Sequence, residues 1–194
     1  MNKLNLPNKL TVARIIATPV FMLFLVWEFK FHYFLALLVF IAASLTDMFD
    51  GQYARKHNMV TNFGKFLDPL ADKMLTTAAF IGFTAKGVGS GIVWILFIVL
   101  FREFLIASLR LVAVSSGGKV IAANNWGKYK TVAQMVAIIY VMFTEGVIAL
   151  ISNPLAIGIL HIFTDLLLWA STILAVISGV IYLLDNLSFV DPSK

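Results

Sequence analysis

Six long apolar runs alternate with short polar segments along the chain. The runs cover residues 10–27, 33–49, 66–84, 92–114, 131–151 and 157–184. About 20 helical residues, each rising about 1.5 Å, cross the hydrocarbon core of a bilayer, which is roughly 30 Å thick. The pattern therefore predicts an all-α integral membrane protein with six transmembrane helices. No internal repeat or low-complexity segment divides the chain, so a single domain is expected over residues 1–194.

Polar, glycine and proline residues indicate where these helices start and end. Asn8 or Thr11 can cap a first helix that starts after Pro7, because their side-chain oxygens can accept a hydrogen bond from a free backbone N–H. The expected connections are the links at 28–32 and 55–65, the glycine-rich turn at 87–91, the polar segment 115–130 and the Asn-Pro break at 153–154.

The composition supports a membrane location. Apolar residues make up 60% of the chain and charged residues 13%, whereas soluble domains have about 45–50% and about 25%. There is no cysteine, so the chain can form neither a disulfide nor a thiolate metal site. Lys3 and Lys9 precede the first apolar run, but no small-residue cleavage site follows it. We therefore expect a retained first span instead of a signal peptide.

The basic residues predict the orientation. The net charge is +5, and most basic residues lie in short segments between apolar runs, which favours a topology signal over nucleic-acid binding. If the N-terminus is cytoplasmic, only Lys30 and Lys86 fall on the opposite side. The cytoplasmic residues are then Lys3, Lys9, Arg14, Arg55, Lys56, Lys65, Lys119, Lys128, Lys130 and Lys194. This asymmetry predicts a multi-pass protein of the cell membrane with both termini in the cytoplasm.

Four aspartates interrupt the apolar pattern at the second connection. Asp47 and Asp50 close the second run, and Asp68 and Asp72 open the third. A helix turns about 100° per residue, so each pair lies within about 60° on one helix face. If two antiparallel helices turn these faces together, four carboxylates converge, and so much negative charge is tolerated only around cations. The spacing predicts a divalent-metal site on the cytoplasmic side.

Small residues and one arginine accompany the aspartates. Gly51 and Ala54 continue the helix face of Asp47, and Gly64 precedes Asp68 by one turn. Because these residues have little or no side chain, a ligand could lie against the backbone. Arg55 offers a planar set of donors suited to phosphate oxygens.

The order of these residues resembles a known signature. The pattern Asp47-x2-Asp50-Gly51-x2-Ala54-Arg55-x8-Gly64-x3-Asp68-x3-Asp72 is similar to that of the CDP-alcohol phosphatidyltransferases, with every signature position filled. The resemblance implies six transmembrane helices and a homodimer. The segments LPNKLTVARIIATPVF, REFLIASLR and GKYKTVAQM are similar to bacterial members whose acceptor is glycerol 3-phosphate.

The resemblance also implies an activity. The primary hydroxyl of glycerol 3-phosphate would displace CMP from CDP-diacylglycerol, and the protein would be surrounded by membrane lipids. The family assigns the metal to Asp47, Asp50, Asp68 and Asp72, and the general base to Asp72, although the residues alone do not choose among the four. All-oxygen ligands suit Mg²⁺ or Mn²⁺, and two ions are expected. Gly51, Ala54, Arg55 and Gly64 would hold the CDP group.

Glycerol 3-phosphate is a dianion and needs a basic pocket. The candidates lie at the end of the fourth run and the start of the fifth, namely Arg110, Lys128, Lys130 and Thr131. Thr11 and Arg14 are weaker candidates near the nucleotide or lipid phosphate. Arg102 and Glu103 could form a buried ion pair or contact other polar groups. Lys73 could pair with a carboxylate. The pattern gives no role to Asp165.

Two alternatives stay open at this point. The same chemistry could use serine, inositol phosphate or phosphatidylglycerol as the acceptor. A divalent-cation transporter would also place carboxylates in membrane helices. The transporter is the weaker alternative, because the aspartates gather at one membrane face and neither broken helices nor inverted repeats are evident.

Overall fold

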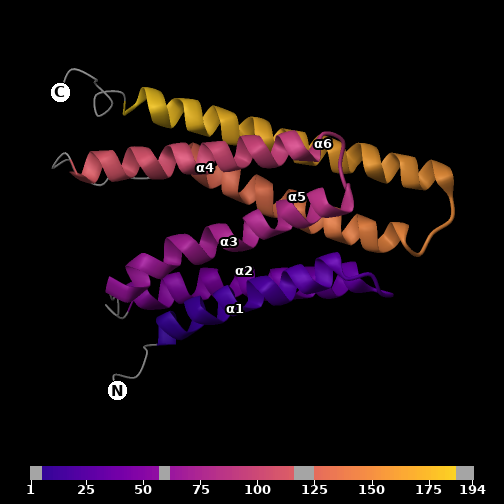
Figure 1. Ribbon diagram of the computed structural model, residues 1–194, viewed down its shortest axis with the longest axis horizontal. Coiled ribbons are helices and arrows are strands. Elements are labelled where there is room, and N and C mark those ends of the chain that lie inside the picture. Colours follow the sequence, from indigo (N-terminus) through magenta and orange to yellow (C-terminus); the bar gives the residue numbers. More distant parts are fainter. Residues whose placement is uncertain (1–5, 57–61, 116–124, 187–194) are drawn as a thin grey trace. The chain divides into compact units, whose positions relative to one another are not determined.

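The computed structural model describes residues 6–56, 62–115 and 125–186. These residues form six α-helices and no strand, which confirms the all-α class (Figure 1). The helices are α1 (Leu6–Val26), α2 (His32–Lys56), α3 (Asn62–Lys86), α4 (Ile92–Ser115), α5 (Asn125–Ile148) and α6 (Pro154–Leu184).

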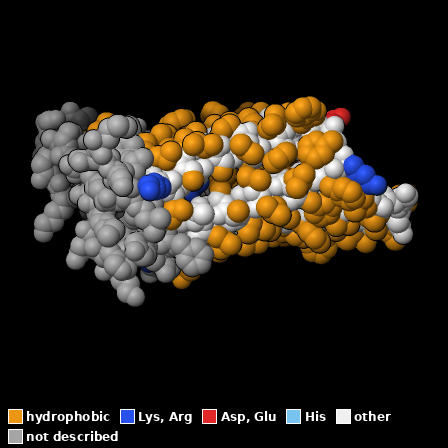
Figure 2. All heavy atoms as spheres, turned by 90° about the horizontal axis from the view of Figure 1, so that it is seen from below, with side chains coloured by type: hydrophobic (Ala, Val, Ile, Leu, Met, Phe, Trp, Pro, Cys, Tyr) orange, Lys and Arg blue, Asp and Glu red, His pale blue; other side chains and the backbone are white. Residues whose placement is uncertain are grey.

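Among the described residues, four helices are long and apolar enough to cross a membrane. The candidate spans are Asn8–Val26, Ile92–Ala113, Asn125–Ile148 and Pro154–Leu184, and α2 holds a shorter apolar stretch, His32–Thr46. Large apolar side chains lie exposed on these helices, and Figure 2 shows them covering most of the described surface on one face. Lipid, unlike water, is a favourable environment for so much exposed apolar surface. The chain is therefore a multi-pass membrane protein.

The contacts within the chain gather in two compact units. The first unit holds residues 1–88 and 138–157, and the second holds residues 89–137 and 158–194. The first unit thus contains α1 to α3 with the end of α5, and the second contains α4, the start of α5 and nearly all of α6. The expectation of a single domain over residues 1–194 stays a prediction.

In the first unit, α1 packs against both α2 and α3. Phe21 of α1 lies beside Phe40 of α2, with ring centroids 5.6 Å apart. Gly82 of α3 lies against α1, since a Cβ placed there would come within 3.0 Å of the Leu25 Cγ. Gly146 of α5 similarly leaves room for the Phe34 ring of α2, which a Cβ would approach to 2.8 Å. Small residues at these two positions thus permit close helix packing.

In the second unit, α4 and α6 run in the same direction. Ser90, just before α4, contacts Asp165 in the first half of α6, and Arg110 contacts Tyr182 near the end of α6. Between these contacts, Ile106 and Leu109 form a buried cluster with Tyr182. If α4, α5 and α6 each cross the membrane once, α4 and α6 should run in the same direction, as they do.

The predicted glycine-rich turn before α4 is confirmed. Its contacts also give a structural role to Asp165, to which the sequence pattern gave none. Gly87, Gly89 and Gly91 all have positive φ, at 65°, 93° and 72°, which L side chains adopt only with strain. The Asp165 carboxylate accepts hydrogen bonds from the Ser90 backbone N–H at 2.7 Å and from its hydroxyl at 2.6 Å. Asp165 therefore anchors this turn to α6.

Several predicted boundaries are wrong. The first helix begins at Leu6, so Asn8 and Thr11 lie inside it and do not cap it. The predicted loop at 55–65 is helical at both ends, because α2 continues to Lys56 and α3 begins at Asn62. Hydropathy marks where a helix leaves the membrane, whereas backbone hydrogen bonds can continue through polar residues beyond that point. Residues 57–61 lie outside the described part of the chain.

Of the two remaining predicted boundaries, one is wrong for the same reason and one is confirmed. The predicted connection 115–130 is helical from Asn125 onward, so Lys128 and Lys130 lie in the first turns of α5; residues 116–124 are not described. The break at 153–154 is confirmed. The Asn153 side-chain oxygen accepts from the backbone N–H of Leu155 at 3.0 Å and caps α6.

Candidate active site

The aspartate motif lies on two continuous helical segments of the first unit. Asp47 to Arg55 belong to α2, and Gly64 to Asp72 belong to α3. Because the backbone is helical, Gly51 and Ala54 share the α2 face of Asp47, and Gly64, Asp68 and Asp72 follow one face of α3. The predicted helical register is therefore present in the backbone. The side chains of the eight motif residues lie outside what the structure describes.

The chemistry of these residues fits a divalent cation. Among the side chains that the structure does describe, no group of three or more His, Asp or Glu residues could hold a metal. The described acids are dispersed, at Glu28, Glu103, Glu145, Asp165 and Asp185. The four aspartates carry carboxylate oxygens, the ligand type that Mg²⁺ and Mn²⁺ prefer, and each pair follows one face of its helix.

A polar stripe on α1 belongs to the same unit. Asn8, Thr11, Arg14 and Thr18 are all buried, and Arg14 is only 2% exposed. Their spacing of three, three and four residues keeps them on one side of the helix. The sequence prediction had placed Thr11 and Arg14 near a phosphate, but it did not recognise the stripe, because burial depends on packing against α2 and α3.

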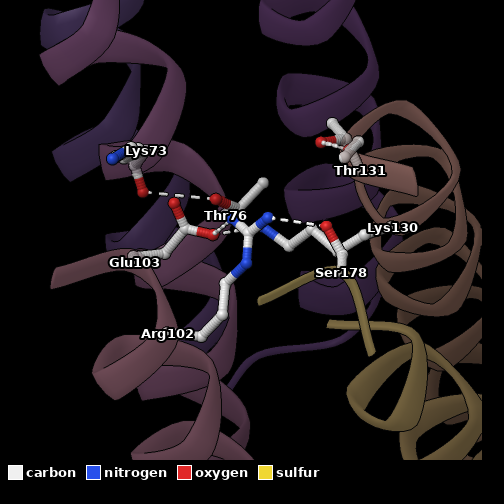
Figure 3. Close-up of polar contacts among 8 residues, drawn as sticks. Lys73, Thr76, Arg102, Glu103, Lys130, Thr131 and Ser178 are labelled. Atoms are coloured by element: carbon white, nitrogen blue, oxygen red, sulfur yellow. Dashed lines mark hydrogen bonds and ion pairs between the residues drawn. The ribbon is translucent and has the colours of Figure 1, made fainter. Parts of the chain in front are cut away.

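The second unit holds a charged cluster made of Arg102, Glu103, Lys130 and Ser178 (Figure 3). One Glu103 oxygen, Oε1, accepts from the Arg102 Nη1 at 2.8 Å and from the Lys130 Nζ. The Arg102 Nη2 donates to the Ser178 hydroxyl at 2.9 Å. The three charged side chains are 8–14% exposed. The ion pair considered for Arg102 and Glu103 is therefore confirmed, and Lys130 extends it to a cluster with a formal charge of +1.

The four candidates for the acceptor phosphate have different surroundings. Arg110 is exposed; its Nε donates to the Tyr182 hydroxyl at 3.3 Å, and its guanidinium lies 5.7 Å from the centre of that ring. Lys128 is exposed, whereas Lys130 is buried beside Glu103. The Thr131 hydroxyl donates to the Gly127 carbonyl at 3.0 Å within α5. Arg110 and Lys128 are thus the two candidates whose charge faces the surroundings.

The sequence prediction missed the contact between Glu103 and Lys130. These residues lie 27 positions apart, on different helices. A usable signal was nevertheless present, because Glu103 interrupts a long apolar run and a charge in a membrane helix usually pairs with another one.

A separate cavity lies at the other end of the first unit. Its volume is about 600 Å³, and it lies among the α1–α2 link, the end of α3 and the end of α5. There Lys86 donates to the exposed Glu28 carboxylate at 2.9 Å, and this hydrogen bond lowers the pKa of Glu28. Lys86 is 14 residues from Asp72 on α3, or about 21 Å along the helix. The cavity is therefore remote from the aspartate motif.

Comparisons with known proteins agree with the family resemblance. Residues 4–177 match the family described as CDP-alcohol phosphatidyltransferase. A Bacillus subtilis protein named CDP-diacylglycerol--glycerol-3-phosphate 3-phosphatidyltransferase is 40% identical, with 94% of this chain and 95% of the relative covered. A Rickettsia bellii protein of the same name is 38% identical over 92% and 93% of the two chains. A Mycobacterium tuberculosis protein named probable phosphatidylglycerophosphate synthase is 39% identical over 92% and 79%.

Proposed function

The chain belongs to the CDP-alcohol phosphatidyltransferase family, and on that premise we propose that it transfers the phosphatidyl group of CDP-diacylglycerol to glycerol 3-phosphate. The products are phosphatidylglycerophosphate and CMP. The observation that carries this proposal is the complete motif on two helical segments, Asp47 to Arg55 and Gly64 to Asp72. The acceptor follows from relatives whose names specify glycerol 3-phosphate and which match nearly the whole chain.

The aspartates would hold the metal. Asp47 and Asp50 of α2, with Asp68 and Asp72 of α3, provide carboxylate oxygens from two helices, enough for two Mg²⁺ or Mn²⁺ ions. Bound there, such ions neutralise the crowded pyrophosphate oxygens and stabilise the phosphate of the departing CMP.

Asp72 is the proposed general base. It accepts the proton of the glycerol 3-phosphate hydroxyl while that oxygen attacks the lipid-side phosphorus of CDP-diacylglycerol. The bond from this phosphorus to the CMP oxygen breaks, so CMP leaves with the bonding electrons. The remaining aspartates would serve as metal ligands.

The small residues of the motif make room for the nucleotide. Gly51 and Ala54 extend the α2 face of Asp47, and Gly64 lies one turn before Asp68 on α3. The CDP group can then approach the helix backbones closely, and Arg55 can donate to a phosphate oxygen. A larger side chain at any of the three small positions would occupy that space.

The acceptor phosphate is assigned to Arg110, Lys128, Lys130 and Thr131. The exposure of Arg110 and Lys128 supports direct contact with a soluble dianion. The cluster charge of +1 supports a role for Lys130, because Glu103 offsets only one of the two cations that contact it.

The proposed topology has six transmembrane helices, with both termini and the active site in the cytoplasm. The common direction of α4 and α6, with α5 between them in sequence, supports alternate crossing. The excess of basic residues near the motif supports the orientation. A homodimer in the membrane is part of the proposal on the strength of the family resemblance.

The test is CMP release by the purified protein. With Mg²⁺ and CDP-diacylglycerol, glycerol 3-phosphate should support release, whereas serine, inositol phosphate and phosphatidylglycerol should not. A neutral acceptor that outperforms glycerol 3-phosphate would contradict the basic-pocket assignment. Absence of release with every acceptor, together with metal flux across proteoliposomes, would favour the transporter alternative.

A further inference from the structure

The buried face of α1 changes character along its length. Thr11, Arg14, Thr18, Phe21 and Leu25 recur at alternating spacings of four and three residues, and each is at most 5% exposed. This spacing is typical of a helix seam that packs against two neighbours. The seam is polar from Thr11 to Thr18 and apolar from Phe21 onward, so the neighbours of its polar part decide what that part does.

Contacts at the apolar part fix the level of α1 against α2. Phe21 contacts Phe40, and the His32 ring nitrogen Nδ1 lies 3.2 Å from the Phe24 carbonyl oxygen. From the first of these pairs to the second, the residue number changes in opposite directions on the two helices, since Phe24 contacts His32 and Phe21 contacts Phe40. The two helices are therefore antiparallel. Seven residues, or about two turns, lead from Phe21 back to Arg14 and from Phe40 forward to residue 47. The contact between Phe24 and His32, extended by ten residues in the same way, leads from Arg14 to position 42. Arg14 is therefore level with positions 42 to 47 of α2, and Asp47 lies at the end of that range.

Contacts with α3 lead to the same level. Gly82 lies against Leu25 and Met22, and Lys86 pairs with Glu28 beyond the end of α1. The two helices are therefore parallel, with an offset of 57 to 60 residues given by these contacts. The same offset places Arg14 level with positions 71 to 74 of α3, within one turn of Asp72.

A buried guanidinium requires an anionic or strongly accepting neighbour. The described acids of the first unit are Glu28 and Glu145. Glu28 lies 14 residues beyond Arg14, or about 21 Å along the direction of α1. Glu145 adjoins Gly146, which contacts Phe34 near the start of α2, and so lies toward that same end. Asp47 and Asp72 are the acids nearest to the level of Arg14.

We propose that Arg14 is a positioning residue of the metal site, which holds a fixed positive charge between the levels of Asp47 and Asp72. This inference rests on the proposed metal site. Without metal, the four carboxylates repel one another across two helices, and the guanidinium offsets part of that repulsion. Arg14 thereby keeps α2 and α3 packed on α1 until divalent ions bind.

The test compares thermal unfolding of the purified full chain in detergent, without substrate, in EDTA and in saturating Mg²⁺. Arg14→Gln removes the charge, so its Tm should fall further below wild type in EDTA than in Mg²⁺, by about 5 °C or more. Arg14→Lys keeps the charge and should respond to Mg²⁺ as wild type does. Thr18→Val lies one turn away and removes only the hydrogen bond to the Arg14 carbonyl; its loss should be equal in both conditions.

A double variant tests the charge pairing directly. Arg14→Gln combined with Asp47→Asn removes one carboxylate together with the cation, so it should be more stable in EDTA than Arg14→Gln alone. If Arg14→Gln alone does not fold, the double variant should, and failure of the double variant would overturn the proposal.

The remaining outcomes separate this inference from the proposed function. A wild-type Tm that Mg²⁺ does not raise would overturn the metal site itself. A normal wild-type response, with the same loss for Arg14→Gln in both conditions, would overturn only the role of Arg14. If Arg14→Gln loses the same Tm in both conditions and CDP raises its Tm less than it raises the Tm of wild type, Arg14 would be reassigned to the substrate phosphate.

Discussion

The aspartate motif of α2 and α3 and the charged cluster of α4 to α6 both place ionisable groups in apolar helices, but their charge balance differs. The motif contributes four acids, whereas the cluster shares one carboxylate between two cations. A buried charge without a partner is costly, so a group of like charges implies a bound counter-ion, and a mixed group can be stable by itself. If the motif is the metal site that we propose, we therefore expect its stability to depend on bound metal, and we expect the stability of the cluster not to.

The largest expected effect tests whether an aspartate of the motif acts as the general base. Asp72→Asn keeps the side-chain shape but can no longer accept a proton, so kcat should fall about 10³-fold or more, within the range of general-base catalysis. CMP release at saturating substrates measures the effect. The control is Asp165→Asn, whose partner is the Ser90 turn; it should lower Tm while retaining most of kcat. An Asp72→Asn protein with more than about a tenth of wild-type kcat would rule out this base.

The next prediction tests whether the cluster is balanced internally. Glu103→Gln leaves Arg102 and Lys130 without their shared anion, and breaking a buried pair in this way costs about 3–5 kcal/mol. Lys130→Met leaves the Arg102–Glu103 pair intact at 2.8 Å and should cost clearly less. Unfolding of both variants in the same detergent measures the order. An equal or larger loss for Lys130→Met would mean that packing, and not charge, dominates the cluster.

The sequence predicted features that depend on residues a few positions apart better than features that depend on distant residues. The register of Asp47 with Asp50, and of Asp68 with Asp72, needs only the helical repeat, and the backbone bears it out. The start of α1, the end of α2 and the starts of α3 and α5 were misjudged, because hydropathy reports the membrane boundary while helical hydrogen bonds extend past it.

Contacts between distant residues had no comparable signal. Ser90 and Asp165 lie 75 positions apart, so the anchoring role of Asp165 appears only once α4 and α6 are packed together. The buried stripe of α1 similarly depends on neighbours supplied by α2 and α3. The acceptor pocket was the hardest to predict, because basic residues near membrane boundaries already serve as topology signals.

A third prediction concerns the acceptor phosphate. Arg110→Ala removes an exposed guanidinium held by Tyr182, so KM for glycerol 3-phosphate should rise about 10- to 100-fold, as expected for loss of a charge-assisted hydrogen bond. KM for CDP-diacylglycerol should not change. Tyr182→Phe keeps the ring but removes the hydroxyl, and should raise the same KM by only a few-fold. Equal rises in both KM values for Arg110→Ala would indicate a structural role instead.

The smallest expected effect comes from the far end of the first unit. The hydrogen bond and charge of Lys86 lower the pKa of Glu28 below its ordinary value of 4.5. The carboxylate therefore binds protons less readily in the folded chain than in the unfolded one. Its stabilising contribution is complete above about pH 4.5 and is lost as the pH falls through the lowered pKa.

The measurement is the difference in Tm between wild type and Glu28→Gln across this acidic range. The difference should be small, because the Glu28 side chain is 84% exposed and exposed pairs contribute little. It should shrink toward zero as the pH falls, and added salt should reduce it further. Since this pair is remote from the aspartates, Mg²⁺ should leave the difference unchanged. A Mg²⁺-dependent difference would show that the two ends of the first unit are coupled.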